Sequence, residues 1–526
     1  MGKGTGESLT DPKNTISQSA FKVTLGSSLT LLAGLASQLV IAWLFGAGYG
    51  VDAYLTAIVI PIYLQAVLIS GLSFVLIPAF VREKSEGRDK DAWALAGTSM
   101  LIIVGFLSII TLICILYSSS IIMLIAPGFD QTKADLSAEM LRIMMFSVPL
   151  IGLSSLAIGI QNARGFFFWP AVAPALGSIG NLVIIWLGTN YIGPMVLAWG
   201  MLFSVIIQSL VVISPVILHK WERLMPLSDP RLIELIRLSL PLIFFGAISR
   251  VTPIFERYFT SGLPDGDLSY LGYSSKISKV VLAVMGSGIA TALFPVMAKE
   301  YSVYGRDRLA KISTYGIRLS LALALPILII LSVTRVPLVE VLYERGAFTN
   351  EDTIMVSRVL PILLAVVVFQ MLGNVIGRSF YITGDTVTVP VGASATSVLY
   401  VIFAGLLIMQ GYGYFGLAIA LLLQWGLLIT VLIYILVKRN ILIHNQLGTW
   451  LMQYIIPALV SGFVAYLLLV LLNNSSIIFQ LILSILGASV TYVTLLFFID
   501  REILLDVMDV VGLLKLFQML NLSRYF

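Results

Sequence analysis

Apolar runs of about 20 residues recur along this 526-residue chain and constrain its fold more than any other feature. One of them, SMLIIVGFLSIITLICILY (99–117), contains no charged residue. A helix of about 20 residues crosses a hydrocarbon core of about 30 Å. Only 11% of the residues are charged and 59% are hydrophobic, whereas soluble domains have about 25% and about 45–50%. We therefore predict an all-α polytopic membrane protein.

The apolar runs and the polar breaks between them predict about fourteen transmembrane helices. A β-barrel is excluded, because its strands would read as alternating segments of about 10 residues. The predicted spans are 21–45, 53–78, 96–117, 138–160, 168–188, 195–217, 234–259, 269–297, 311–334, 355–380, 388–410, 413–437, 449–472 and 476–499.

Charge on the loops predicts the orientation of the chain. Residues 1–20 are polar and lack the apolar core of a signal peptide, so we expect this tail to lie in the cytoplasm. Lys and Arg then concentrate on cytoplasmic loops, as the positive-inside rule requires. These residues are Arg82, Lys84, Arg88, Lys90, Lys220, Arg223, Lys299, Arg306, Arg308, Lys311, Lys438 and Arg439, against Lys133, Arg335 and Arg345 on outer loops.

An internal repeat recurs at a separation of about 217 residues. The segment FVLIPAFVREKSEGRDKDAWALAG (74–97) is echoed by TALFPVMAKEYSVYGRDRLAKISTYG (291–316), and IAPGF (125–129) is echoed by ERGAF (344–348). Two similarly oriented halves with a binding site between them are a common plan of transporters. We expect a tail (1–20), an N-terminal six-helix lobe (21–220), a C-terminal six-helix lobe (231–440), two additional helices (449–499) and a cytoplasmic tail (500–526).

Charged residues fall within the seventh predicted span, in LSLPLIFFGAISRVTPIFERYF (238–259). No turn signal interrupts this stretch, so we expect one helix to carry Arg250, Glu256 and Arg257. Arg250 and Arg257 are seven residues apart, which places them within about 20° of one helix face. Pro253 is expected to kink or open the helix. Lys276 and Lys279, three residues apart in the next span, also share a side.

A charge at the bilayer centre costs about 2.5–3.5 kcal/mol and usually marks a pathway or a binding site. These four cations predict a basic cavity for an anion, and arginine suits phosphate because its planar fork binds two oxygens. The alternative is that Glu256 pairs with an arginine while Arg257 and Lys276 extend to the membrane interface. Glu256 is then a salt-bridge partner, or otherwise a proton-linked switch. Arg378 and Arg164 are equally compatible with interfacial anchoring.

Several site classes have no support in the sequence. The single cysteine, Cys114, excludes an intramolecular disulfide, and His219 and His444 lie too far apart to suggest a metal site. The basic residues are scattered rather than gathered into a patch for nucleic acid. We expect no cofactor, no metal and no nucleic-acid partner.

Four stretches are similar to the MurJ (MviN) lipid II flippase family of the multidrug/oligosaccharidyl-lipid/polysaccharide exporter superfamily. They are LFGAGYGVDAYLTAIVIP (44–61), QNARGFFFWPAVAPALGSIGN (161–181), LYERGAFTNEDT (342–353) and RSFYITGDTVTVPV (378–391). The resemblance implies a fourteen-helix fold with a central cationic cavity and a lipid-facing groove formed by the last two helices. It places Lys276 at a cavity arginine of the family and Arg378 at the arginine that opens the family's R-x-F-Y motif.

The chain departs from the family pattern in its first two spans. Positions that are charged in the family are occupied here by Leu31, Ser37, Gln38, Gln65, Ala66 and Ser70. Most of the cavity charge of the N-terminal lobe is therefore missing. The cations that could bind a substrate then lie mainly in the C-terminal lobe.

The resemblance implies a flippase in the bacterial inner membrane that moves an undecaprenyl-diphosphate-linked precursor, lipid II, by alternating access. Expected partners are this lipid-linked glycan, membrane lipids and a coupling ion, H⁺ or Na⁺. Alternatives are a flippase for another lipid-linked oligosaccharide or exopolysaccharide unit, a multidrug or cation antiporter, and a non-transporting scaffold. A cation antiporter needs acidic cavity residues to bind its substrate, whereas the predicted cavity residues here are mainly basic. A glycosyltransferase needs acids or a metal in a sizeable loop, so we expect no enzyme.

Overall fold

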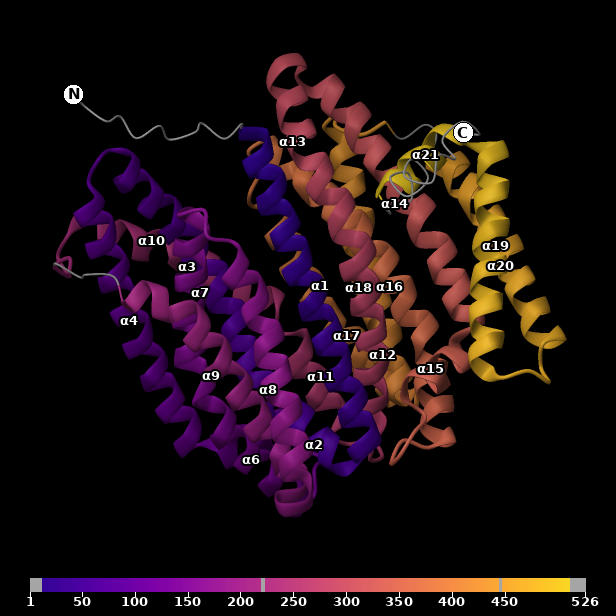
Figure 1. Ribbon diagram of the computed structural model, residues 1–526, viewed down its shortest axis with the longest axis horizontal. Helices are drawn as coiled ribbons and strands as arrows, with labels where there is room; N and C mark the ends of the chain where they lie inside the picture. Colours follow the sequence, from indigo (N-terminus) through magenta and orange to yellow (C-terminus); the bar gives the residue numbers. More distant parts are fainter. Residues whose placement is uncertain (1–11, 219–222, 444–446, 511–526) are drawn as a thin grey trace, which may run out of the picture. The chain divides into compact units, whose positions relative to one another are not determined.

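The computed structural model describes residues 12–218, 223–443 and 447–510, and the regular structure in these ranges is helical (Figure 1). This confirms the prediction of an all-α polytopic protein. Twelve segments of the described chain are long and apolar enough to cross a membrane. One of these segments, Phe168–Val216, contains two helices that are each of membrane length, with 25 and 22 residues. The predicted count of fourteen spans is not confirmed.

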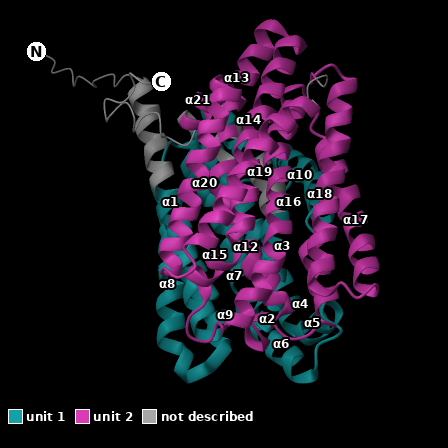
Figure 2. Ribbon diagram, turned by 90° about the vertical axis from the view of Figure 1, so that its right-hand side faces the viewer, with its two compact units in different colours: residues 1–45, 53–250 teal, residues 46–52, 251–526 magenta. Residues whose placement is uncertain are grey.

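The chain divides into two compact units, residues 1–45 with 53–250 and residues 46–52 with 251–526 (Figure 2). Helix α2 (Tyr49–Ala57) begins in the second unit and ends in the first. The other helices of the first unit are α1 (Pro12–Phe45), α3 (Val59–Ser85), α4 (Asp89–Leu116), α5 (Ser118–Ile125), α6 (Gln131–Met145), α7 (Ser147–Ala163), α8 (Phe168–Ile192), the 3-10 turn η1 (Gly193–Met195), α9 (Val196–Ile217) and α10 (Pro230–Ser249).

The second unit begins with two short helices and a π-helical turn, which longer helices follow. Its elements are α11 (Thr252–Thr260), α12 (Asp267–Val281), the π turn η2 (Leu282–Gly286), α13 (Ser287–Tyr304), α14 (Arg306–Val333), α15 (Arg335–Tyr343), α16 (Asn350–Ile382), α17 (Thr388–Met409), α18 (Gly413–Lys438), α19 (Leu447–Leu471), α20 (Ile477–Ile499) and α21 (Arg501–Val510).

The seventh predicted span is broken in the middle. Helix α10 ends at Ser249, and α11 begins at Thr252 with Pro253 in its first turn. Proline has no N–H, and its ring clashes with the carbonyl four residues earlier, which here is Ser249. The expected opening at Pro253 is therefore present, but the expectation of one continuous helix is wrong. Arg250 and Arg257 lie on opposite sides of this break, so the prediction that they share one helix face is also wrong.

The same proline spacing breaks two further spans. Helix α2 ends at Ala57, four residues before Pro61, and α6 ends at Met145, four residues before Pro149. In both cases the next helix begins two residues after the previous one ends. At these positions a proline therefore divides an apolar run that reads as a single helix into two shorter helices.

The two halves of the chain repeat their local structure, which supports the internal repeat. Helices α4 and α14 each have 28 residues, and a short helix follows each of them. The segments after these short helices, Gln131–Ala163 and Asn350–Ile382, each have 33 residues. In the first half this segment is split into α6 and α7, whereas in the second it is the continuous helix α16.

The turns that end these segments are also alike. Gly165 and Gly384 both have a φ of +81°, a conformation that residues with a Cβ rarely adopt. In each turn the residue after the glycine donates its N–H to a carbonyl five residues earlier, Phe166 to Gln161 and Asp385 to Phe380. This is the bond expected of a helix that ends at a left-handed glycine.

Helix α12 is capped by a residue that is distant in the sequence. The Asp52 carboxylate, which is 2% exposed, accepts hydrogen bonds from the N–H groups of Gly266 (2.8 Å) and Ser269 (2.9 Å) and from the Ser269 hydroxyl. The first N–H groups of a helix have no partner within the helix, and a carboxylate also complements the helix dipole. Asp52 thus fixes the start of the helix that carries Lys276 and Lys279.

The last two long helices are joined to α14 by a polar cluster. Arg318 of α14 forms an ion pair with Asp500 (2.6 Å), and its guanidinium lies 5.1 Å from the ring centroid of Trp450. Tyr454 of α19 donates to the same carboxylate at 2.8 Å. Buried apolar residues from α14, α16, α18, α19 and α20 form one core around these helices. The second unit therefore includes α19 and α20.

We expect Asp52→Ala to lower the melting temperature of the purified protein by several degrees. The substitution leaves buried N–H donors of α12 without an acceptor, at about 1–3 kcal/mol for each group. Thermal unfolding in detergent measures the effect. Asp135→Ala, which removes an exposed carboxylate, is the matched control and should change the melting temperature little. Equal melting temperatures for both variants would contradict the capping role.

Candidate functional site

The predicted cations of the second unit lie on α11 and α12. Arg257 forms an ion pair with Glu256 at 2.7 Å, and their side chains are 13% and 18% exposed. The Lys279 ammonium is close enough to interact electrostatically with Glu256 and with Arg257. The Lys276 ammonium is close enough to interact with that of Lys279. Both lysine side chains are exposed. Three cations and one acid give this group, which we call the basic cluster, an excess of positive charge.

A buried tyrosine adjoins the basic cluster, and sequence reasoning missed it. Tyr400 of α17 is fully buried, and its hydroxyl has no hydrogen-bond partner in the described part of the chain. It interacts electrostatically with Glu256 and Arg257. No charge or motif marks Tyr400 in the sequence, so only the packing of α11 against α17 identifies it.

Two other predicted residues have their own surroundings. Arg250 is exposed at the end of α10 and belongs to the first unit, whereas the basic cluster belongs to the second. Arg378 of α16 is partly buried, with its guanidinium 5.3 Å from the ring centroid of Phe294 on α13. That distance is typical of a cation–π contact. The structure thus brings together Glu256, Arg257, Lys276 and Lys279.

Two of the four family-like motifs meet in the second unit. Gly46 has a φ of +61°, and a Cβ there would lie 2.4 Å from the carbonyl oxygen of Ala347. The Tyr273 hydroxyl donates to the Gly46 carbonyl at 2.7 Å, and its ring lies against Tyr343 and Phe348. The segments 44–61 and 342–353 therefore hold the backbone around α12 in place, and their residues act through packing.

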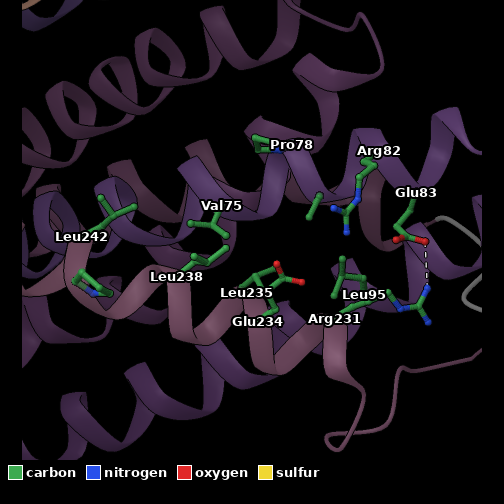
Figure 3. Close-up of a pocket in the computed structure, with 12 residues that line it drawn as sticks. Val75, Pro78, Arg82, Glu83, Leu95, Arg231, Glu234, Leu235, Leu238 and Leu242 are labelled. Carbon is green, nitrogen blue, oxygen red and sulfur yellow. Dashed lines mark hydrogen bonds and ion pairs between the residues drawn. The ribbon is translucent and has the colours of Figure 1, made fainter. Parts of the chain in front are cut away.

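A cavity of about 480 Å³ lies in the first unit between α3, α4 and α10 (Figure 3). It is charged at one end and apolar at the other. We call it the α3–α10 pocket, and its lining residues are Val75, Pro78, Ala79, Arg82, Glu83, Leu95, Arg231, Glu234, Leu235, Leu238, Pro241 and Leu242. Sequence reasoning placed these residues in separate spans and loops and did not predict the pocket.

An ion-pair network closes the charged end of the pocket. Glu83 is 1% exposed and pairs with Arg88 (2.7 Å) and Arg231 (3.1 Å). Arg231 also pairs with Asp91 (3.3 Å) and Asp229 (3.0 Å). The hydrogen bond from Arg88 is the main reason that the pKa of Glu83 lies below its usual value.

The described residues contain no group of three or more His, Cys, Asp and Glu side chains that could hold a metal ion. His219 and His444 lie outside the described residues. Cys114, on α4, is partly buried. The basic cluster of the second unit is the candidate site, because its excess of positive charge suits an anion.

Comparison with known proteins decides the family. The family model described as "Lipid II flippase MurJ" matches residues 41–487, which is most of the chain. The chain belongs to the lipid II flippase MurJ family. A protein of Buchnera aphidicola subsp. Acyrthosiphon pisum named "Probable lipid II flippase MurJ" is 27% identical over 386 residues, covering 72% of this chain and 75% of that protein.

Solved structures show the same fold. A structure titled "Lipid II flippase MurJ, inward closed conformation" matches with a TM-score of 0.79 and 21% identity, covering 91% of this chain and 99% of that one. An inward-facing multidrug resistance transporter of the MATE family matches with a TM-score of 0.67 and 17% identity, covering 80% and 98%. The resemblance inferred from the sequence motifs is confirmed.

The structure gives one of the uncharged positions of the first helix a structural role. Ser37 of α1 is 7% exposed, and its hydroxyl accepts a hydrogen bond from the Asn181 side chain of α8 at 2.7 Å. A charged side chain at this buried position would require its own partner. Ser37, which stands where the family has a charged residue, thus forms a buried contact between α1 and α8.

We expect Arg88→Gln to lower the melting temperature at neutral pH, because it leaves the buried Glu83 with one ion-pair partner instead of two. Hydrogen bonds to charged groups contribute about 1.5–3 kcal/mol. The lowered pKa of Glu83 means that this stabilisation is present above its unfolded pKa of about 4.3 and is lost as pH falls.

The measurement is the melting temperature of wild type and Arg88→Gln from pH 8 to pH 3.5. The difference should be full above about pH 5 and shrink towards zero at the acid end. Lys84→Gln removes an exposed cation of α3 next to Glu83 in the sequence; it is the control and should match wild type throughout. A difference that does not change with pH would show that Glu83 ionisation is not its cause.

Proposed function

We propose that the chain is a flippase that moves lipid II from the inner to the outer leaflet by alternating access. The observation that carries the proposal is the basic cluster, in which Arg257, Lys276 and Lys279 face a single acid. Family membership supports the choice of substrate, and the MATE-like fold supports alternating access. In this proposal the cations hold the diphosphate of the lipid carrier.

The chemistry of the cluster fits a diphosphate. An ammonium or guanidinium group forms strong charge-assisted hydrogen bonds to phosphate oxygens. Glu256 is already paired with Arg257, so it neutralises one cation and leaves the lysines to the substrate. We propose further that Arg250 and Arg378 contribute to substrate passage, as separate sites to be tested by substitution.

We also propose where the protein lies and how its chain is divided into lobes. The protein lies in the bacterial inner membrane with both termini in the cytoplasm, as the loop charges favour. The lobes are 21–220 and 231–440, and the helices within 449–499 form a groove for the polyprenyl tail. Membrane potential or an H⁺ or Na⁺ gradient drives the cycle, since one charge moved across 100 mV is worth about 2.3 kcal/mol. The chain performs transport and no covalent catalysis.

A second candidate is a flippase for another lipid-linked oligosaccharide. The observation that favours it is the loss of charge in the first two spans, where Ser37 makes a structural hydrogen bond and Gln65 stands at a position that is charged in the family. Fewer cations would make fewer contacts with a glycan or a phosphate. Both candidates share the diphosphate clamp and differ in the sugar.

Rescue of a bacterium whose own lipid II flippase is switched off tests the proposal. Wild type should restore growth, whereas Lys276→Ala and Lys279→Ala should each reduce rescue, and the double variant should abolish it. Loss of one charge-assisted contact weakens anion binding by about tenfold to a hundredfold. Lys438→Ala, which removes an exposed lysine at the end of α18, should rescue as well as wild type.

Membrane levels of each variant separate loss of function from loss of protein. Full rescue by the double lysine variant would show that the two lysines are not needed to hold the diphosphate. Failure of a well-inserted wild type would overturn lipid II as substrate and favour the second candidate. Mass spectrometry of the lipid-linked saccharides that accumulate when the native gene is deleted then identifies the sugar.

Arg250→Ala tests the break between α10 and α11 by itself. If Arg250 helps the diphosphate to pass, rescue falls while membrane levels stay normal. The matched control is Arg237→Ala, which removes another exposed arginine of α10 and should rescue fully. Rescue by Arg250→Ala equal to wild type would confine the proposed site to the second unit.

A further inference from the structure

The α3–α10 pocket has a polarity gradient that no part of the proposed transport uses. On α3 the lining runs from Val75 through Ala79 to Arg82, and on α10 from Leu242 through Leu238 to Glu234. These positions recur at intervals of three or four residues, so each set lies on one helix face. Seven residues of helix rise about 10 Å. The pocket therefore changes from apolar to charged over about the length of a lipid head group.

Two opposite charges lie at the polar end, and neither has an ion-pair partner among the described residues. They are Arg82 and Glu234, and both side chains are exposed. Figure 3 shows both side chains directed into the space between α3 and α10. Arg231 differs, because Glu83, Asp91 and Asp229 already bind its guanidinium. The pocket thus offers one free cation and one free anion to an occupant.

A buried acceptor lies beside these two charges. Glu83 lines the pocket, and its Oε2 accepts from Arg88 and Arg231. Its Oε1 is buried and has no hydrogen-bond partner among the described residues. A buried acceptor without a donor costs about 1–3 kcal/mol. An occupant that brings hydrogen-bond donors to this end would reduce that cost.

We propose that the α3–α10 pocket binds a zwitterionic phospholipid with a primary ammonium, of the phosphatidylethanolamine type. Arg82 binds its phosphate, Glu234 accepts hydrogen bonds from its ammonium, and Leu238, Leu242 and Val75 contact the upper acyl chains. The volume of about 480 Å³ is within the usual range of about 300–1,000 Å³ for ligand sites. A diphosphate fits this pocket poorly, because Glu83 and Glu234 would repel it. The charges of this pocket therefore suit a different ligand from that of the basic cluster.

Native mass spectrometry of the full-length, delipidated protein in detergent tests this site. The probes are phosphatidylethanolamine, phosphatidylcholine and phosphatidylglycerol with identical chains. Ethanolamine lipid should bind several-fold more tightly than choline lipid, whose trimethylated ammonium donates no hydrogen bond. Glu234→Gln should weaken ethanolamine-lipid binding about tenfold and abolish the difference between the two head groups, and Arg82→Gln should weaken both lipids about tenfold.

Matched variants show whether the effect belongs to the pocket. Lys84→Gln on α3 and Arg237→Gln on α10 remove exposed cations that do not line it, and both should bind all three lipids within twofold of wild type. Leu238→Trp, which fills the apolar part, should weaken ethanolamine-lipid binding without changing any charge. Melting temperatures establish that each variant is folded.

Two results would overturn the proposal. The first is ethanolamine-lipid binding that is unchanged in both Arg82→Gln and Glu234→Gln. The second is tighter binding of the anionic glycerol lipid, strengthened by Glu234→Gln, which would make the pocket an anion site. Neither result bears on the rescue experiment, because the lysines of the basic cluster are unchanged in these variants.

Discussion

In hydrocarbon every backbone N–H and C=O must be hydrogen-bonded, and the architecture of this protein depends on that constraint. It accounts for the long helices and for the effect of a proline where one interrupts a span. Pro253 removes a donor and excludes the carbonyl of Ser249, so α10 ends there and α11 begins anew. The break places Arg250 at a helix end in one unit and Arg257 inside a short helix of the other. The proline therefore places the two arginines on separate helices.

The ends of the helices need partners of the same kind, and distant segments supply them. Asp52 caps α12 although 214 residues separate it from Gly266. Asp500 has a different role, because it binds the side chains of Arg318 on α14 and Tyr454 on α19 and so links these two helices. In both places a carboxylate with low exposure is held by several donors. Such groups stabilise the fold only while all their partners are present, which makes these clusters sensitive to single substitutions.

The sequence predicts the helical class well, because apolar runs of membrane length have few alternative structures. It also predicts that Lys276 and Lys279 share a side, since a three-residue interval is a property of the helix itself. It predicts an opening at Pro253, but it does not predict that one helix ends at Ser249 and another begins at Thr252, nor the burial of Tyr400. The α3–α10 pocket was missed because Glu83 and Arg231 are 148 residues apart. Their proximity results from tertiary packing, which periodicity does not encode.

The two groups of charges differ in their balance, and this difference favours an anionic substrate. At the charged end of the α3–α10 pocket, the acids Glu83, Asp91 and Asp229 match the arginines that they bind. In the basic cluster, Glu256 is engaged by Arg257, and among the described residues no second acid offsets Lys276 and Lys279. A cationic drug would meet two ammonium groups and a carboxylate that is already paired. A diphosphate would instead supply the negative charge that the cluster lacks, so substrate binding would lower the electrostatic cost of holding three cations together.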